Sequence, residues 1–158
     1  MANKTSKKHR PAGRLDRNTR NMVNLTANPV WRAFATKPVS EENQTTIGLA
    51  GRKALYALSN GLGKFENFNE LAVTAHSAIV LAEVGYGSDL IDDFNNALKA
   101  ILICRLRALQ GEEYAFNAQD AEVVAVLLDL HEQQVQLAGK ADLANALVEG
   151  YGRESGAR

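Results

Sequence analysis

Three histidines and one cysteine are the side chains most able to act as metal ligands, general bases or nucleophiles. A helical di-metal site requires a Glu-x-x-His spacing, but leucine and valine stand three residues before His131 and His76. His131 falls on an apolar helix face. That position is typical of a structural histidine with one hydrogen bond, and the functional alternative is a buried base or pH switch. Helical spacing also places Cys104 beside core positions, so we interpret it as an inert thiol.

Two further patterns resemble nucleotide- or DNA-binding motifs only in outline. Residues 61–64 read Gly-Leu-Gly-Lys, but a phosphate-binding loop also needs glycine at position 58 and Ser or Thr at position 65, where this chain has Leu and Phe. The glycine turn at residues 85–87 could join a helix-turn-helix, but the second helix would present aspartates that phosphate repels. We therefore predict no enzyme activity and no metal or cofactor site. An enzyme with an unrecognised site remains an alternative to the functions proposed below.

Positive charge is concentrated at the N-terminus. Residues 1–20 hold a single acid, Asp16, and carry a net charge of +6, against −6 for the remaining 138 residues. The basic side chains of this segment are Lys4, Lys7, Lys8, Arg10, Arg14, Arg17 and Arg20. They could contact the phosphates of a nucleic acid or the acidic surface of a protein, with an affinity that falls steeply with salt. The alternative is that the segment folds back on the acidic remainder of the chain or aids solubility.

The first 21 residues have almost nothing with which to form a core. Met1 and Leu15 are their only large apolar side chains, so burial cannot offset the entropy of ordering the backbone. We interpret residues 1–21 as a flexible basic arm. Just after it, Trp31 lies close to Val30 and Phe34, and tryptophan is favoured at interface hot spots. Trp31 is therefore a second candidate for partner binding, and the alternative is that it staples the arm to the rest of the protein.

Composition points to a globular protein of the reducing cytoplasm. The chain has 158 residues, of which 46% are hydrophobic, and it holds one cysteine. Apolar runs are too short to span a membrane, and the basic N-terminus lacks the apolar stretch of a secretory signal. We expect a cytoplasmic protein with no membrane contact.

Helical periodicity dominates the sequence after residue 38. It predicts four main helices, which begin near Ser40, near Asn67 or Asn69, at Ser88 and at Asn117, and a short last helix over about residues 140–149. The third helix carries the widest apolar stripe over residues 90–109, so we expect it at the centre. The alternation of Tyr114 and Phe116 suggests a short extended segment before the fourth helix.

These elements predict an all-α fold, a helix bundle of four main helices plus short helices with a flexible basic N-terminal arm. The expected organisation is a basic arm over residues 1–21, a helical bundle domain over residues 22–150 and a polar C-terminal tail over residues 151–158. Because the bundle is short and rich in apolar residues, we expect two faces of the central helix to need cover, which predicts a homodimer.

Four short motifs resemble small uncharacterised α-helical proteins encoded by phages and prophages of Gram-negative bacteria. They are Lys8-His9-Arg10-Pro11, Glu83-Val84-Gly85-Tyr86-Gly87, Tyr114-Ala115-Phe116-Asn117 and Leu128-Asp129-Leu130-His131-Glu132-Gln133-Gln134. The resemblance covers the arm and about half of the chain. In the last motif Glu-Gln-Gln stands where the family pattern would have Asp-Ala-Gln. The family brings no known activity, so the resemblance implies only a mobile-element origin and an accessory role.

Together these features predict a non-enzymatic phage or mobile-element accessory protein in a bacterial host cell. We expect it to act by binding a host macromolecule: a protein partner such as a defence or regulatory complex, or nucleic acid through the basic arm. A structural component of a phage particle or of a transfer apparatus is the alternative.

Overall fold

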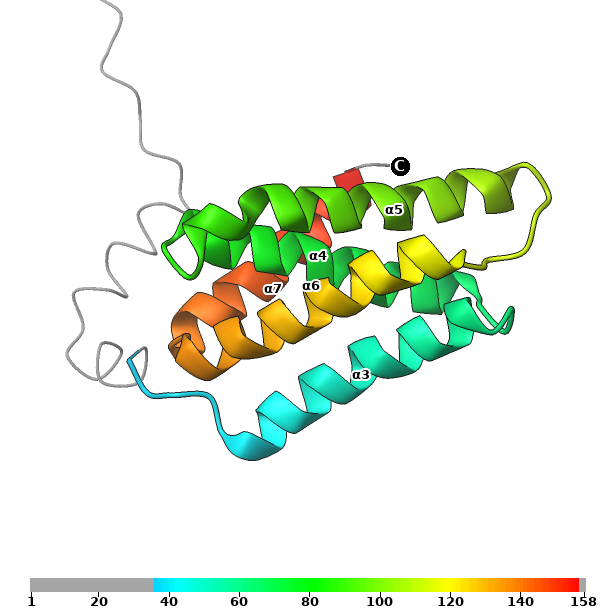
Figure 1. Ribbon diagram of the computed structural model, residues 1–158. Coiled ribbons are helices and arrows are strands. Elements are labelled where there is room, and N and C mark those ends of the chain that lie inside the picture. Colours follow the sequence, from blue (N-terminus) through cyan, green and yellow to red (C-terminus); the bar gives the residue numbers. More distant parts are fainter. Residues whose placement is uncertain (1–35, 157–158) are drawn as a thin grey trace, which may run out of the picture. The chain divides into compact units, whose positions relative to one another are not determined.

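The computed structural model describes residues 36–156, and within them the chain is all-α. The elements are α3 (Glu41–Ser59), α4 (Phe65–Glu83), a 3₁₀ turn η1 (Ser88–Leu90), α5 (Ile91–Leu109), α6 (Ala118–Leu137) and α7 (Lys140–Gly156). Figure 1 shows α3, α6 and α5 one above another, with α4 and α7 behind them. This arrangement confirms the expected helix bundle. The predicted arm, residues 1–21, lies outside the described residues.

Two helices, α3 and α6, begin where the sequence predicts them. α3 begins directly after Ser40 with Glu41 and Glu42 in its first turn, where carboxylates favour the positive end of the helix. α6 begins after Asn117, whose side chain accepts a hydrogen bond of 2.8 Å from the backbone N–H of Asp120. The expected extended segment before α6 is present as an isolated β-bridge between Tyr114 and Gly63.

Two predicted helix starts are wrong by a few residues. α4 begins at Phe65 rather than near Asn67, because the Asn67 side chain lies inside the first turn and accepts a hydrogen bond of 3.0 Å from the Lys64 backbone N–H. Ser88 starts the 3₁₀ turn instead of capping α5, which begins at Ile91. At Asn67 a residue suited to capping forms a different local contact.

The central helix is α4, not α5 as the sequence suggested. α4 packs against α3, α5, α6 and α7, whereas α5 packs mainly on α4 and α6. From residue 71 to residue 82 every α4 side chain except that of His76 is buried. The physical reason is that alanine recurs around α4 and, with Ser77, lets neighbouring helices approach on several sides, while α5 keeps one strongly polar face.

α7 extends to Gly156, well beyond the predicted end near residue 149, so the expected polar tail begins later. Gly150 lies against α4, where a Cβ atom would come within 3.0 Å of the carbonyl oxygen of Val73 and 2.5 Å of Ser77 Oγ. One turn later Glu154 is buried, and Arg153 forms an ion pair of 2.7 Å with Glu83 of α4. A segment that is polar in composition is therefore held in helix by tertiary contacts.

Glycine at position 150 should be required for the close contact of α7 with α4. Replacing Gly150 with alanine should cost about 1–3 kcal/mol, since the new methyl group meets backbone atoms of α4 that cannot move aside cheaply. The matched control is Gly152→Ala in the same helix, where a Cβ meets nothing within 4 Å and alanine should gain up to about 1 kcal/mol in helix propensity. Chemical denaturation measures both, and shifts of the same sign and size would contradict this packing.

The core consists of one large apolar cluster and a smaller one. The large cluster joins α3, α4, α5 and α6 around the fully buried Phe68, Phe94 and Ile101. The smaller cluster lies where α6 turns into α7 and includes Val39, Leu81, Val135 and Leu143. Within residues 36–156, no helix combines the length and the apolar character that a membrane span requires.

Candidate functional site

The binding residues predicted from the sequence all lie outside the part of the chain that the structure describes. They are Lys4, Lys7, Lys8, Arg10, Arg14, Arg17, Arg20 and Trp31. The structure instead describes the charge of the remaining part of the chain. Over residues 36–156 the chain carries nine Lys and Arg residues against seventeen Asp and Glu residues, a net charge of −8.

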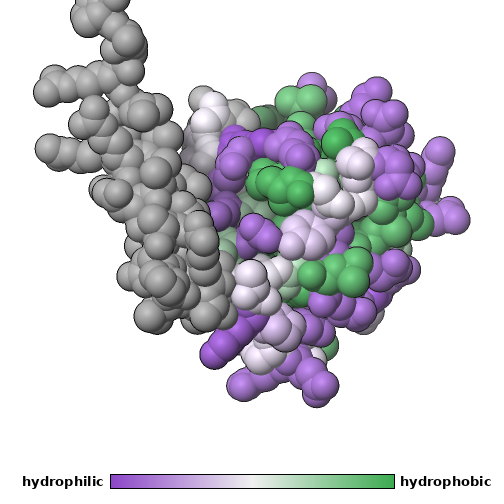
Figure 2. All heavy atoms as spheres, turned by 90° about the vertical axis from the view of Figure 1, so that its left-hand side faces the viewer, coloured by the Kyte–Doolittle hydropathy of each residue, from purple (hydrophilic) through white to green (hydrophobic). Residues whose placement is uncertain are grey.

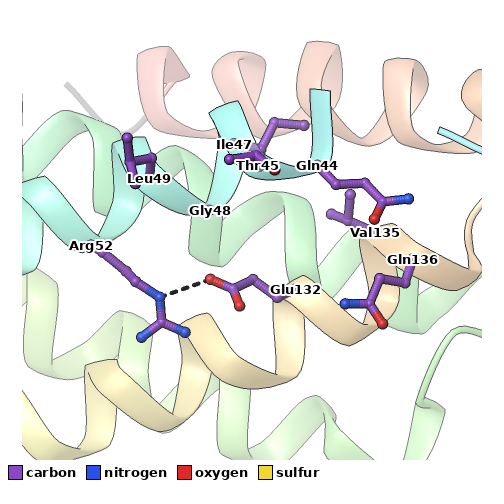
Figure 3. Close-up of a pocket in the computed structure, with 9 residues that line it drawn as sticks. All are labelled: Gln44, Thr45, Ile47, Gly48, Leu49, Arg52, Glu132, Val135 and Gln136. Carbon is purple, nitrogen blue, oxygen red and sulfur yellow. Dashed lines mark hydrogen bonds and ion pairs between the residues drawn. The ribbon is translucent and has the colours of Figure 1, made fainter. Parts of the chain in front are cut away.

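A pocket of about 280 Å³, lined by both polar and apolar side chains, lies between α3 and α6 (Figure 3). Its edge is built by Arg52, whose Nε donates to Glu132 Oε1 at 2.9 Å and whose Nη2 donates to Asp129 Oδ1 at 2.7 Å. These two carboxylates raise the pKa of Arg52 above its ordinary value. The guanidinium thus joins the two helices. The pocket is also lined by uncharged polar side chains, those of Gln44, Thr45 and Gln136.

Gly48 lines the same pocket. A Cβ atom at Gly48 would approach Glu132 Oε1 to 2.8 Å, so a larger residue there would require the flexible end of the Glu132 side chain to move. On the other side of Ile47 lies a second, more apolar pocket of about 320 Å³ between α3 and α7, which Val39, Leu143 and Leu147 help to line. The N-terminal half of α3 is therefore a ridge between two shallow pockets. A ridge between shallow pockets suits contact with another chain better than enclosure of a small molecule.

His131 sits in a buried polar network in the middle of the bundle. Its Nδ1 lies 3.2 Å from Gln134 Oε1, and Gln134 Nε2 donates to the carbonyl oxygens of Ala78 at 3.0 Å and Tyr86 at 2.7 Å. His131 Nε2 is buried without a hydrogen-bond partner. The contact therefore matches the expected packing-site histidine with one hydrogen bond. An Nδ1–H donated to Gln134 leaves Nε2 as an unprotonated acceptor, which is the neutral form.

Burial lowers the pKa of His131 below its ordinary value of 6.5. The unfolded chain therefore binds a proton more readily than the folded chain, and stability should fall as the pH drops below 6.5 towards the folded pKa. We expect this histidine to contribute a loss of up to about 1.4 kcal/mol per pH unit in that window. Denaturation at pH 7.5 and pH 5.5 should show a smaller loss for His131→Gln than for the parent chain, and equal losses would contradict the assignment.

The surroundings of Cys104 do not activate its thiol. Cys104 is buried, its Sγ lies 3.6 Å from the carbonyl oxygen of Ala115, and desolvation raises the pKa of its thiol. A raised pKa leaves less thiolate for nucleophilic attack. Partial burial and the nearby Arg153 charge lower the pKa of His76. Among residues 36–156 no three His, Cys, Asp or Glu side chains gather closely enough to hold a metal ion.

A buried ion pair joins α5 to the end of α7. Arg105 Nη1 lies 3.2 Å from Glu154 Oε1, and its guanidinium stands 5.3 Å from the centre of the Phe68 ring, a favourable cation–π distance. Glu154 is only 2% exposed, and its Oε2 has no hydrogen-bond partner. Glu154 falls in the segment predicted as a polar tail and was not among the predicted site residues. Its signal would have been the seven-residue spacing from Leu147, which returns to the same helix face.

The surface of the described residues also carries exposed apolar side chains. Figure 2 shows the end of the bundle at which α6 turns into α7, where hydrophobic patches are separated by hydrophilic side chains. The most continuous apolar series lies elsewhere, on the outer side of α5, where Leu106 is 58% and Leu109 is 70% exposed.

No family model, curated protein or solved structure matches this chain.

Proposed function

We propose that the chain is a non-enzymatic accessory protein of a phage or other mobile element, which binds an anionic macromolecule of the host cell through its basic arm. The observation that carries this proposal is the separation of charge. Seven basic residues and one acid occupy positions 1–20, whereas residues 36–156 carry a net charge of −8. An acidic body repels phosphate and acidic surfaces, so it leaves the arm as the segment that attracts them.

All four arginines of the described body are used internally. Arg52, Arg105, Arg107 and Arg153 each form an ion pair with an acidic side chain of a neighbouring helix or with one on their own helix. Four of the nine positive charges are thereby compensated within the bundle. This pairing supports a division in which the bundle is a scaffold and the arm makes the electrostatic contact.

The chemistry of the arm defines the class of partner. It has no aromatic side chains on which bases could stack, so it suits charge recognition without sequence preference. An acidic face of a host regulatory or defence complex meets this requirement, and so does the backbone of a nucleic acid. Trp31, eleven residues after the last arginine of the arm, would add an apolar anchor to a protein partner.

The test is recovery of host partners by the full chain and two matched variants. The arm variant carries Lys4→Gln, Lys7→Gln and Lys8→Gln, and the body variant carries Lys37→Gln, Lys53→Gln and Lys64→Gln at exposed positions, so both lose three charges. We expect the arm variant to recover at least tenfold less partner and the body variant to behave like the parent chain. Nuclease treatment separates nucleic acid from protein partners, and equal recovery by both variants would overturn the proposal.

A further inference from the structure

Two different apolar stripes run along α5. Phe94, Ala97, Ile101 and Cys104 form the buried stripe that faces α4 and α6. A second stripe, which we call the outer stripe, consists of Leu98, Leu102, Leu106 and Leu109. Its spacings of four, four and three residues keep all four leucines on one side of the helix, beside the buried stripe.

The outer stripe becomes more exposed towards the end of α5. Leu98 and Leu102 are partly buried, whereas Leu106 is 58% and Leu109 is 70% exposed. Figure 1 shows α5 along one edge of the bundle, on the side away from α3. Each exposed leucine leaves apolar area in water that association with another apolar surface would remove, at about 25 cal/mol per Å².

Unpaired charges of opposite sign stand near the two ends of the outer stripe. Lys99 directly follows Leu98, the first leucine of the stripe, and Glu112 lies three residues after Leu109, the last one. Both side chains are exposed, and neither is part of an ion pair within residues 36–156. A surface with a positive end, an apolar middle and a negative end is complementary to itself when a second copy is turned end to end.

We infer that the outer stripe of α5 is the contact surface of a homodimer in which two α5 helices pack antiparallel. In this pairing Leu102 of one copy faces Leu109 of the other, Leu106 lies near the two-fold axis, and Lys99 faces Glu112 at both ends. The overlap from residue 99 to residue 112 is about 20 Å long at 1.5 Å per residue. A single helix pair of this length is a small interface, so the dimer should dissociate in roughly the micromolar range.

Sedimentation of the full chain over a range of concentrations tests whether the outer stripe forms the dimer contact. Leu106→Glu with Leu109→Glu should raise the dimer dissociation constant more than tenfold. The control Leu137→Glu changes a residue that is 75% exposed at the end of α6 and should leave the constant unchanged. All three changed residues are exposed, so the melting temperature at dilute concentration checks that the variants fold. A parent chain that stays monomeric, or a dimer that resists the double change, would overturn the inference.

Charge exchange tests the antiparallel arrangement. Lys99→Glu alone places two acidic side chains opposite each other at both ends and should weaken the dimer, and Glu112→Lys alone should do the same with two basic side chains. The double variant Lys99→Glu with Glu112→Lys restores opposite charges and should recover the parent affinity. Failure of the double variant to recover it would contradict the antiparallel pairing.

Discussion

Replacing Ile101 with aspartate should abolish the folded state under conditions where the parent chain is stable. Ile101 is fully buried in the large apolar cluster. The substitution removes its apolar contacts, worth about 2–5 kcal/mol, and places an unpaired charge among Leu, Phe and Ala side chains at a cost of about 3–5 kcal/mol. Their sum approaches or exceeds the total stability of an ordinary domain, which is about 5–15 kcal/mol.

The matched control is Ile103→Asp, two residues along the same helix. Ile103 is 40% exposed, so its aspartate keeps contact with water and should cost less than about 1 kcal/mol. Circular dichroism during thermal unfolding compares the two variants directly. If Ile101→Asp melted at the same temperature as Ile103→Asp, the assignment of the inner face of α5 would be wrong.

Replacing Gln134 with leucine should cause a comparably large loss in the free energy of unfolding. The Gln134 amide donates to two backbone carbonyls, those of Ala78 and Tyr86, and accepts from His131. Leucine has a similar volume but no polar atoms, so it leaves the His131 N–H and the Tyr86 carbonyl without their partner. At about 1–3 kcal/mol for each buried unsatisfied group, the expected loss is roughly 2–6 kcal/mol.

Its neighbour Gln133 provides the control, because the same chemical change occurs there on an exposed side chain. Gln133→Leu should alter the free energy of unfolding by no more than about 0.5 kcal/mol. Urea denaturation of both variants gives the two values. Similar losses at the two positions would show that the amide of Gln134 does not hold α6 to α4 and to the turn after it.

The sequence predicted the fold class and the helices whose ends carry local signals. α3 and α6 begin where Ser40 and Asn117 stand before their first turns, and a glycine follows the end of α3. Local signals failed for the end of α7, because Gly150 and Glu154 lie beyond the predicted helix end near residue 149 and their contacts with α4 and α5 hold them in helix. Those contacts join residues about 50 to 75 positions apart in the chain. The seven-residue spacing of Glu154 from Leu147 indicates its helix face but not its partner.

The prediction that α5 is the central helix was wrong for a related reason. The sequence pattern predicts one wide apolar stripe on α5, whereas the structure divides its apolar residues into a buried stripe and the outer stripe. His131 is buried with one hydrogen bond, as predicted, but its partner Gln134 was not identified, although the spacing of three residues places both on one helix face. Glutamine is usually exposed, so its burial could not be inferred without the position of α4.

The most direct test of the central claim, that the arm attracts an anionic macromolecule, is a titration of a fluorescent DNA duplex with the full chain at about 50 mM and about 200 mM salt. The duplex serves as a simple polyanion, because an arm that is free to contact an acidic protein surface is also free to contact phosphate. We expect binding at low salt that falls steeply at high salt. The arm variant should reduce the slope of log K against log salt by about 2.7, since each lost phosphate contact removes about 0.9, and the body variant should leave the slope unchanged. No binding of the full chain at 50 mM salt, or equal slopes for the arm and body variants, would contradict the account.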